Sequence, residues 1–68
     1  MTSRFSSAAV SAAMALIGQY GDDAEVIATL RAAELAGLGD ADGLAAWDEI
    51  IACIGDIQTG GAGAGARH

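Results

Sequence analysis

The sequence predicts an all-α fold, a compact three-helix bundle followed by a disordered C-terminal tail rich in glycine and alanine. Its 68 residues contain no proline, and alanine is the commonest residue type; these two residues have the lowest and the highest helix propensity. Apolar residues recur at the helical period of 3.6 in three segments, and glycines separate the segments. Short connections between consecutive helices favour roughly antiparallel packing.

The first helix is expected from about Ser6 to Tyr20, with Gly21 ending it. Polar or small residues fall on one side of this segment, which we expect to face solvent. The opposite, inner face is expected to carry Val10, Ala13, Met14, Ile17 and Tyr20.

The second helix is expected to begin at Asp22 or Asp23, because a short carboxylate can accept hydrogen bonds from the free amides of a first helical turn. It is expected to continue to about Ala36, ahead of Gly37 or Gly39, either of which can supply the left-handed residue that ends a helix. Its expected inner stripe consists of Val26, Ile27, Leu30 and Ala33.

Two features of this second segment fit a plain monomer poorly. Glu34 falls within the expected inner stripe, where a buried carboxylate would need a partner such as Arg31 or Arg4. Leu35 points nearly opposite to the stripe, and Leu38 is also expected to be exposed. Exposed leucines are common, but this pair is a candidate contact surface.

The third segment has the clearest core-facing stripe, formed by Leu44, Trp47, Ile50, Ile51, Ile54 and Ile57. Off this stripe lie Asp48, Glu49, Ala52 and Asp56, so a solvated acidic face is expected. The stretch 59–68 carries no large apolar side chain, and ordering its glycines costs too much entropy. We therefore expect one domain over 6–58 and a flexible tail over 59–68.

Charge and cysteine content exclude several classes of protein. Nine acidic residues against three arginines give a net charge of -6, which argues against direct binding to nucleic acid or an anionic membrane surface. One cysteine cannot form an internal disulfide and gives no sign of an oxidising compartment. The apolar stretch after Arg4 is interrupted by serines and follows a single positive charge, so neither a signal peptide nor a membrane span is expected. The expected location is cytoplasmic.

The stretch GDADGLAAWDEII has spacing that hints at a calcium-binding loop. With Asp40 as the first ligand, however, Leu44 occupies the fifth position and Glu49 the tenth, where the motif needs an oxygen ligand at five and a glutamate at twelve. A helix start fits every residue, because Gly39 can end one helix, Asp40 can cap the next and Asp42 suits its first turn. No metal or cofactor is expected.

The sequence gives equally weak support to a zinc site or a catalytic site. Structural zinc needs about four ligands, and the chain offers Cys53 and His68. Asp48 and Glu49 point about 100° apart on a helix, which is unsuited to a paired acid and base, and no base is at hand for a serine nucleophile. We expect no enzymatic activity.

The stretch YGDDAEVIATLRAAELAGLGDADGLAAWDEI resembles a group of short alphaproteobacterial helical proteins classed only as a domain of unknown function. The resemblance would cover about 12–58, and it implies a helical fold and a cytoplasmic location but no activity, ligand or functional residue. The chain does not resemble an acyl carrier protein, because the serine that would take the phosphopantetheine arm, ahead of the second helix, is missing. The residues that carry the resemblance are Tyr20, Gly21, Arg31, Gly39, Asp40, Gly43, Trp47 and Ile50.

A protein–protein interaction or accessory module is the function that these observations predict. Three short alanine-rich helices bury little apolar surface unaided, and association with a protein partner or a second copy would bury more. Trp47 suits either the core or an interface, and Cys53 either a buried apolar site or a regulatory thiol. The predicted interaction surface consists of Leu35, Leu38, Trp47, Asp48 and Glu49.

An acidic inhibitor or nucleic-acid mimic, binding the basic cleft of a nucleic-acid enzyme, is the alternative function. It would rest on the net charge of -6 and on the carboxylates of Asp22, Asp23, Asp40, Asp42, Asp48, Glu49 and Asp56.

Overall fold

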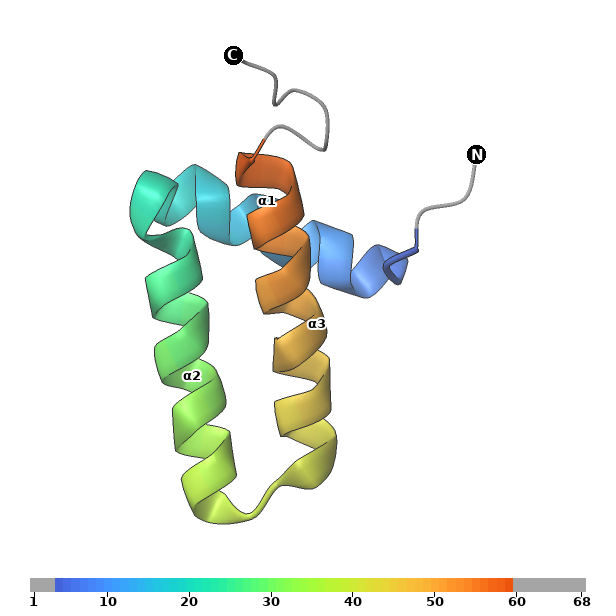
Figure 1. Ribbon diagram of the computed structural model, residues 1–68, viewed down its shortest axis with the longest axis vertical. Coiled ribbons are helices and arrows are strands. Elements are labelled where there is room, and N and C mark those ends of the chain that lie inside the picture. Colours follow the sequence, from blue (N-terminus) through green and yellow to red (C-terminus); the bar gives the residue numbers. More distant parts are fainter. Residues whose placement is uncertain (1–3, 60–68) are drawn as a thin grey trace.

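The computed structural model describes residues 4–59 as three α-helices in a bundle, which confirms the predicted all-α fold (Figure 1). The helices are α1 (Ser7–Tyr20), α2 (Ala24–Leu38) and α3 (Ala41–Gln58), and a short 3-10 turn, η1 (Gly21–Asp23), joins the first two. Helices α2 and α3 lie side by side as an antiparallel hairpin, and α1 crosses one end of it. The predicted flexible tail lies, apart from Thr59, outside the described residues.

The hairpin turn between α2 and α3 is built from local chemistry that the sequence predicts. Gly39 has a φ of 75°, and its amide donates to the Ala36 carbonyl while the Asp40 amide donates to the Leu35 carbonyl. This pair of bonds is the Schellman motif, which satisfies carbonyls at a helix end. The Asp40 carboxylate then accepts from the Gly43 amide at 2.9 Å, so one residue completes α2 and caps α3. A Cβ at position 43 would lie 2.6 Å from Asp40 Oδ2, so any larger residue there would force the capping carboxylate to shift.

The start of α2 corrects the prediction that Asp22 or Asp23 caps it. Asp23 occupies the N-cap position, but its backbone is helical, with φ of -88° and ψ of 0°, and its side chain makes no capping bond. The chain leaves α1 at Gly21, whose φ is 61°, and runs through η1 directly into α2. The Ala24 amide is satisfied by the Gly21 carbonyl instead of a carboxylate.

Alanine dominates the core. Ile54 and Cys53 are the largest side chains that are fully buried, and both belong to α3. Partly buried residues surround this cluster, among them Phe5, Leu16, Trp47 and Ile51. The buried residues are Ala9, Ala13, Ala24, Ala28, Ala32, Ile50, Cys53 and Ile54.

The predicted inner stripe of α2 is wrong at every member except Ile27, which is partly buried, because the helix is rotated about its axis relative to expectation. Val26 and Leu30 are 58% and 59% exposed, and Ala33 is exposed as well. Ala24, Ala28 and Ala32 point inward instead. The distance between packed helices depends on the side chains at their contact, and alanine permits the close approach that three helices need where α1 crosses the hairpin.

The predicted inner stripes of α1 and α3 are confirmed for their central residues, but some of their outer residues are exposed. In α1, Ala13 is buried with Ala9, but Met14 and Tyr20 are exposed. In α3, Ile50 and Ile54 are buried, and the rest of the stripe is partly buried or, at Ile57, exposed.

The N-cap positions of α2 and α3 give a matched test of this fold. The substitution Asp40→Ala removes the carboxylate that caps α3. This substitution should lower the free energy of unfolding by about 1 kcal/mol. Replacing Asp23→Ala removes a carboxylate that makes no capping bond and should change stability by less than about 0.5 kcal/mol. Urea unfolding followed by circular dichroism measures both. Equal losses for the two variants would contradict the assigned caps.

Candidate interaction surface

One continuous uncharged surface runs along the outer side of α2. At about 100° per residue, its six members fall within roughly 120° of the helix circumference, on the side opposite the buried alanines. All six are exposed. The three charged residues of α2, Glu25, Arg31 and Glu34, lie outside this arc. We call the surface the outer band; it consists of Val26, Thr29, Leu30, Ala33, Ala36 and Gly37.

The outer band presents no free hydroxyl proton to a partner. Thr29 is its one side chain with a hydrogen-bonding group, and its hydroxyl donates to the Glu25 carbonyl at 2.8 Å within the same helix. Burial of Thr29 would therefore leave its donor satisfied. At the N-terminal end of the band, Val26 and Thr29 border a shallow open hollow shared with Asp22 and Glu25.

Helix α2 is thus apolar on two opposite sides. Its inner side buries Ala24, Ala28 and Ala32 against the rest of the bundle, while its outer side exposes Val26 and Leu30. A surface helix normally has one apolar stripe and a polar opposite face, and a helix that is apolar all round is normally buried. The outer band is therefore an apolar surface of α2 that the described part of the chain leaves exposed.

The residues that the sequence analysis assigned to an interaction surface are dispersed. Leu38 is 79% exposed at the end of α2, and Asp48 is exposed on α3. Leu35 and Trp47 are partly buried, so the expectation that Leu35 points away from the core is wrong. Glu49 is also partly buried and faces the beginning of α1. The band on α2 was missed because its large residues were assigned to the core.

Glu34 does not lie in the core, contrary to its place in the predicted stripe. Its side chain is 67% exposed, and its carboxylate lies 3.4 Å from the Arg31 guanidinium one turn earlier. Because the helix is rotated, Glu34 sits beside the outer band at the edge of the uncharged arc. An exposed pair of this kind adds little to stability.

Polar contacts between α1 and α3 were not predicted, and they correct the expectation of a fully solvated acidic face. The Glu49 carboxylate accepts from the Ser6 amide at 2.7 Å, and the Ser6 hydroxyl accepts from the Ala9 amide at 3.1 Å. These are the two bonds of a capping box, with the glutamate supplied by a distant helix. Position 9 is alanine instead of the usual glutamate or glutamine, so the first turn of α1 supplies no side-chain partner of its own to the Ser6 amide.

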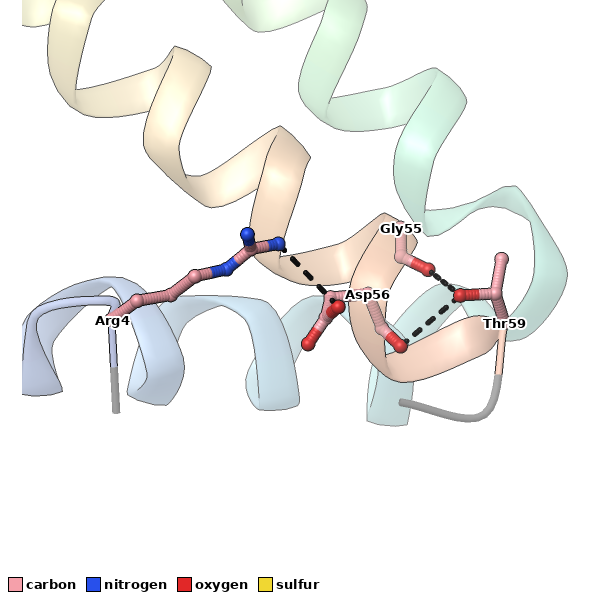
Figure 2. A network of polar contacts seen from close by, with 4 residues as sticks. All are labelled: Arg4, Gly55, Asp56 and Thr59. Carbon is pink, nitrogen blue, oxygen red and sulfur yellow. Dashed lines mark hydrogen bonds and ion pairs between the residues drawn. The ribbon is translucent and has the colours of Figure 1, made fainter. Parts of the chain in front are cut away.

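A second network of polar contacts lies at the C-terminal end of α3 (Figure 2). Arg4 reaches Asp56 at 3.5 Å, with the Arg4 side chain 73% exposed and the Asp56 side chain 43% exposed. The Thr59 hydroxyl donates to the Gly55 carbonyl at 2.8 Å, closing the last turn of α3. The Gln58 side-chain amide donates to the Gly21 carbonyl at 2.8 Å. These contacts hold α3 against the chain segments at both ends of α1.

The acidic residues do not gather on one surface. Asp22 and Asp23 lie where α1 meets α2, and Asp40 and Asp42 lie at the opposite end of the hairpin. The 15 residues of α2 separate the two pairs, a length of about 22 Å. Glu49 and Asp56 are engaged with the N-terminal end of α1. This distribution gives no specific support to a nucleic-acid mimic.

No group of three or more potential metal ligands comes together within residues 4–59. In the stretch that hints at a calcium loop, the Asp40 carboxylate caps α3. Among the described helices, none combines the length and apolar character needed to cross a membrane.

Cys53 is buried in α3, with 2% of its surface exposed. Burial raises the pKa of its thiol, the charges of Asp56 and Glu49 raise the pKa further, and the charge of Arg4 opposes them. Reactive cysteines are partly exposed and have a lowered pKa, so neither property of Cys53 favours a regulatory thiol.

The chain matches no protein-family model, no curated protein and no solved structure. The resemblance to short alphaproteobacterial proteins therefore stays a prediction.

The raised pKa of Cys53 predicts a pH-dependent stability. The folded chain keeps the thiol neutral at a pH where the unfolded chain ionises it, so this contribution is complete below about pH 8.5 and is lost as the pH rises through the raised pKa. The stability difference between the wild type and Cys53→Ala should therefore be constant below about pH 8.5 and shrink as the pH rises above it. Urea unfolding at several pH values measures it, and a constant difference would contradict the buried neutral thiol.

Proposed function

We propose that this chain is a small acidic helical module that acts by binding another protein chain, and that it has no catalytic activity of its own. The outer band of α2 carries this proposal. It is the one surface of that helix where large apolar side chains, Val26 and Leu30, stand exposed without an intervening charge.

The composition of the core supports an association function. The largest side chains that are fully buried are Ile54 and Cys53, and most other buried residues are alanines, which contribute little burial energy each. Meanwhile Val26 and Leu30 are each more than half exposed. Fully burying such a side chain is worth about 1.5–3 kcal/mol, so a partner on the outer band would add a large fraction of the stability that a domain of this size attains.

Charge restricts the kind of partner. A net charge of -6 disfavours contact with nucleic acid and with anionic lipid, whereas the uncharged band can be buried without leaving a charge unpaired. The proposed partner is therefore a protein that contributes apolar side chains. A cytoplasmic location is part of the proposal, since Cys53 is a free, buried thiol of the kind found in reducing compartments.

Thiol labelling in living cells tests whether the band is covered. Ala33→Cys places a thiol in the outer band, and Ala45→Cys places one on an exposed position of α3; the native Cys53 is buried. In cells of the native host, a permeable maleimide should label Ala33→Cys about tenfold more slowly than it labels the dilute purified variant, because a bound partner excludes the probe. The Ala45→Cys control should be labelled at the same rate in both settings.

Equal labelling rates for Ala33→Cys in cells and in dilute solution would contradict the proposed function. Protection of both variants to the same extent would also contradict it, because it would report a general effect of the cell and no specific contact at the band.

A further inference from the structure

We infer that the outer band is bound by the same band of a second copy, with the two α2 helices packed antiparallel in a symmetric dimer. This inference rests on the proposed function and names the partner for the same surface.

The spacing of the band supports a helix–helix contact. Its central residues, at positions 26, 30, 33 and 37, follow steps of four, three and four, which is the pattern of apolar residues that packs one helix along another. The 15 residues of α2 span about 22 Å, so all four residues can take part in one contact.

The order of large and small residues supports a second copy as the occupant. The two large residues, Val26 and Leu30, come first, and the two small ones, Ala33 and Gly37, come second. In an antiparallel pair with its two-fold axis between Leu30 and Ala33, each Leu30 lies opposite an Ala33 and each Val26 opposite a Gly37. In a symmetric dimer every contact occurs twice, so four large-to-small layers form. A parallel pair would set large against large and leave a gap at glycine.

Charge places a further condition on this dimer. The central layers contain no charged side chain. Glu25 and Glu34 lie at the two edges of the contact, while Arg31 lies nearly opposite it on the helix. The same pairing brings the Asp23 end of one α2 near the Asp40 end of the other, where like charges repel across solvent. Salt screens exposed charges of this kind, so the dimer should become tighter as salt is added.

Sedimentation equilibrium of the full chain tests the dimer. The wild type should reach twice the chain mass of 6.7 kDa, and its dissociation constant should fall between 50 mM and 500 mM NaCl. Leu30→Asp should raise the dissociation constant by about 100-fold or more, because each dimer would bury two unpaired charges. Leu38→Asp is the matched control, since Leu38 is on the same helix, is 79% exposed and lies outside the band. It should change the constant by less than about threefold, and circular dichroism should show native helix content in both.

Disulfide cross-linking tests the register. Antiparallel pairing places position 26 opposite position 37 of the second copy, while the two copies of position 26 lie about 16 Å apart along the axis. A disulfide needs Cα atoms within about 7 Å. Mild oxidation should therefore cross-link a mixture of Val26→Cys and Gly37→Cys chains, and neither variant unmixed. Within one chain, no contact opposes a side chain at position 37, because an added Cβ has no neighbour within 4 Å there.

A wild type that remains monomeric up to about 1 mM would overturn the inference, as would equal weakening by Leu30→Asp and Leu38→Asp. Cross-linking of each cysteine variant with itself would overturn the antiparallel register. A monomeric chain whose Ala33→Cys variant is still protected in cells would leave the proposed function standing with a different protein on the band. A dimer whose Ala33→Cys variant is unprotected in cells would support the inference and contradict the proposed function.

Discussion

The close approach of three helices through alanine is the interaction on which the rest of this structure depends. Ala9 and Ala13 of α1 belong to one buried cluster with Ala24 and Ala28 of α2, alongside Ile54 and Cys53 of α3. Small side chains let helices pack at short distance, although each alanine buries only a small apolar area. The polar contacts of Ser6 with Glu49 and of Gln58 with Gly21 lie around this crossing and fix its geometry.

This packing determines which side of α2 remains outside. Once the alanines face inward, the helix period directs Val26 and Leu30 outward, and the bundle has no element left to cover them among the described residues. The proposed function follows from the same constraint that makes the fold: a core made of small residues leaves the larger apolar side chains available for a partner. The acidic surface elsewhere restricts that partner to a contact made through the uncharged band.

Local chemistry was predictable from the sequence at the hairpin turn, but the cap of α2 and the rotation of that helix were not. Gly39 and Asp40 act through bonds to residues within five positions, so residue type was enough to assign the hairpin turn. The stripe of α2 was assigned to the larger residues because burial energy scales with apolar area, yet the short distance at the crossing selects the alanines. The Ser6–Glu49 and Arg4–Asp56 contacts join positions 43 and 52 residues apart, and spacing along one helix carries no information about them. The predicted surface residues shared the same error: Leu35 is partly buried, and the band centred on Leu30 was placed inside.

Nuclear Overhauser effects between methyl groups test the inward rotation of the alanines most directly. In a chain with labelled alanine, isoleucine and leucine methyls, the account predicts cross-peaks from Ala24 and Ala28 to the buried pair Ile50 and Ile54, with no cross-peak from Leu30 to either isoleucine within one chain. Cross-peaks from Leu30 to Ile54, with Ala24 and Ala28 showing none, would mean that α2 buries its larger residues. The outer band would then not exist as a surface.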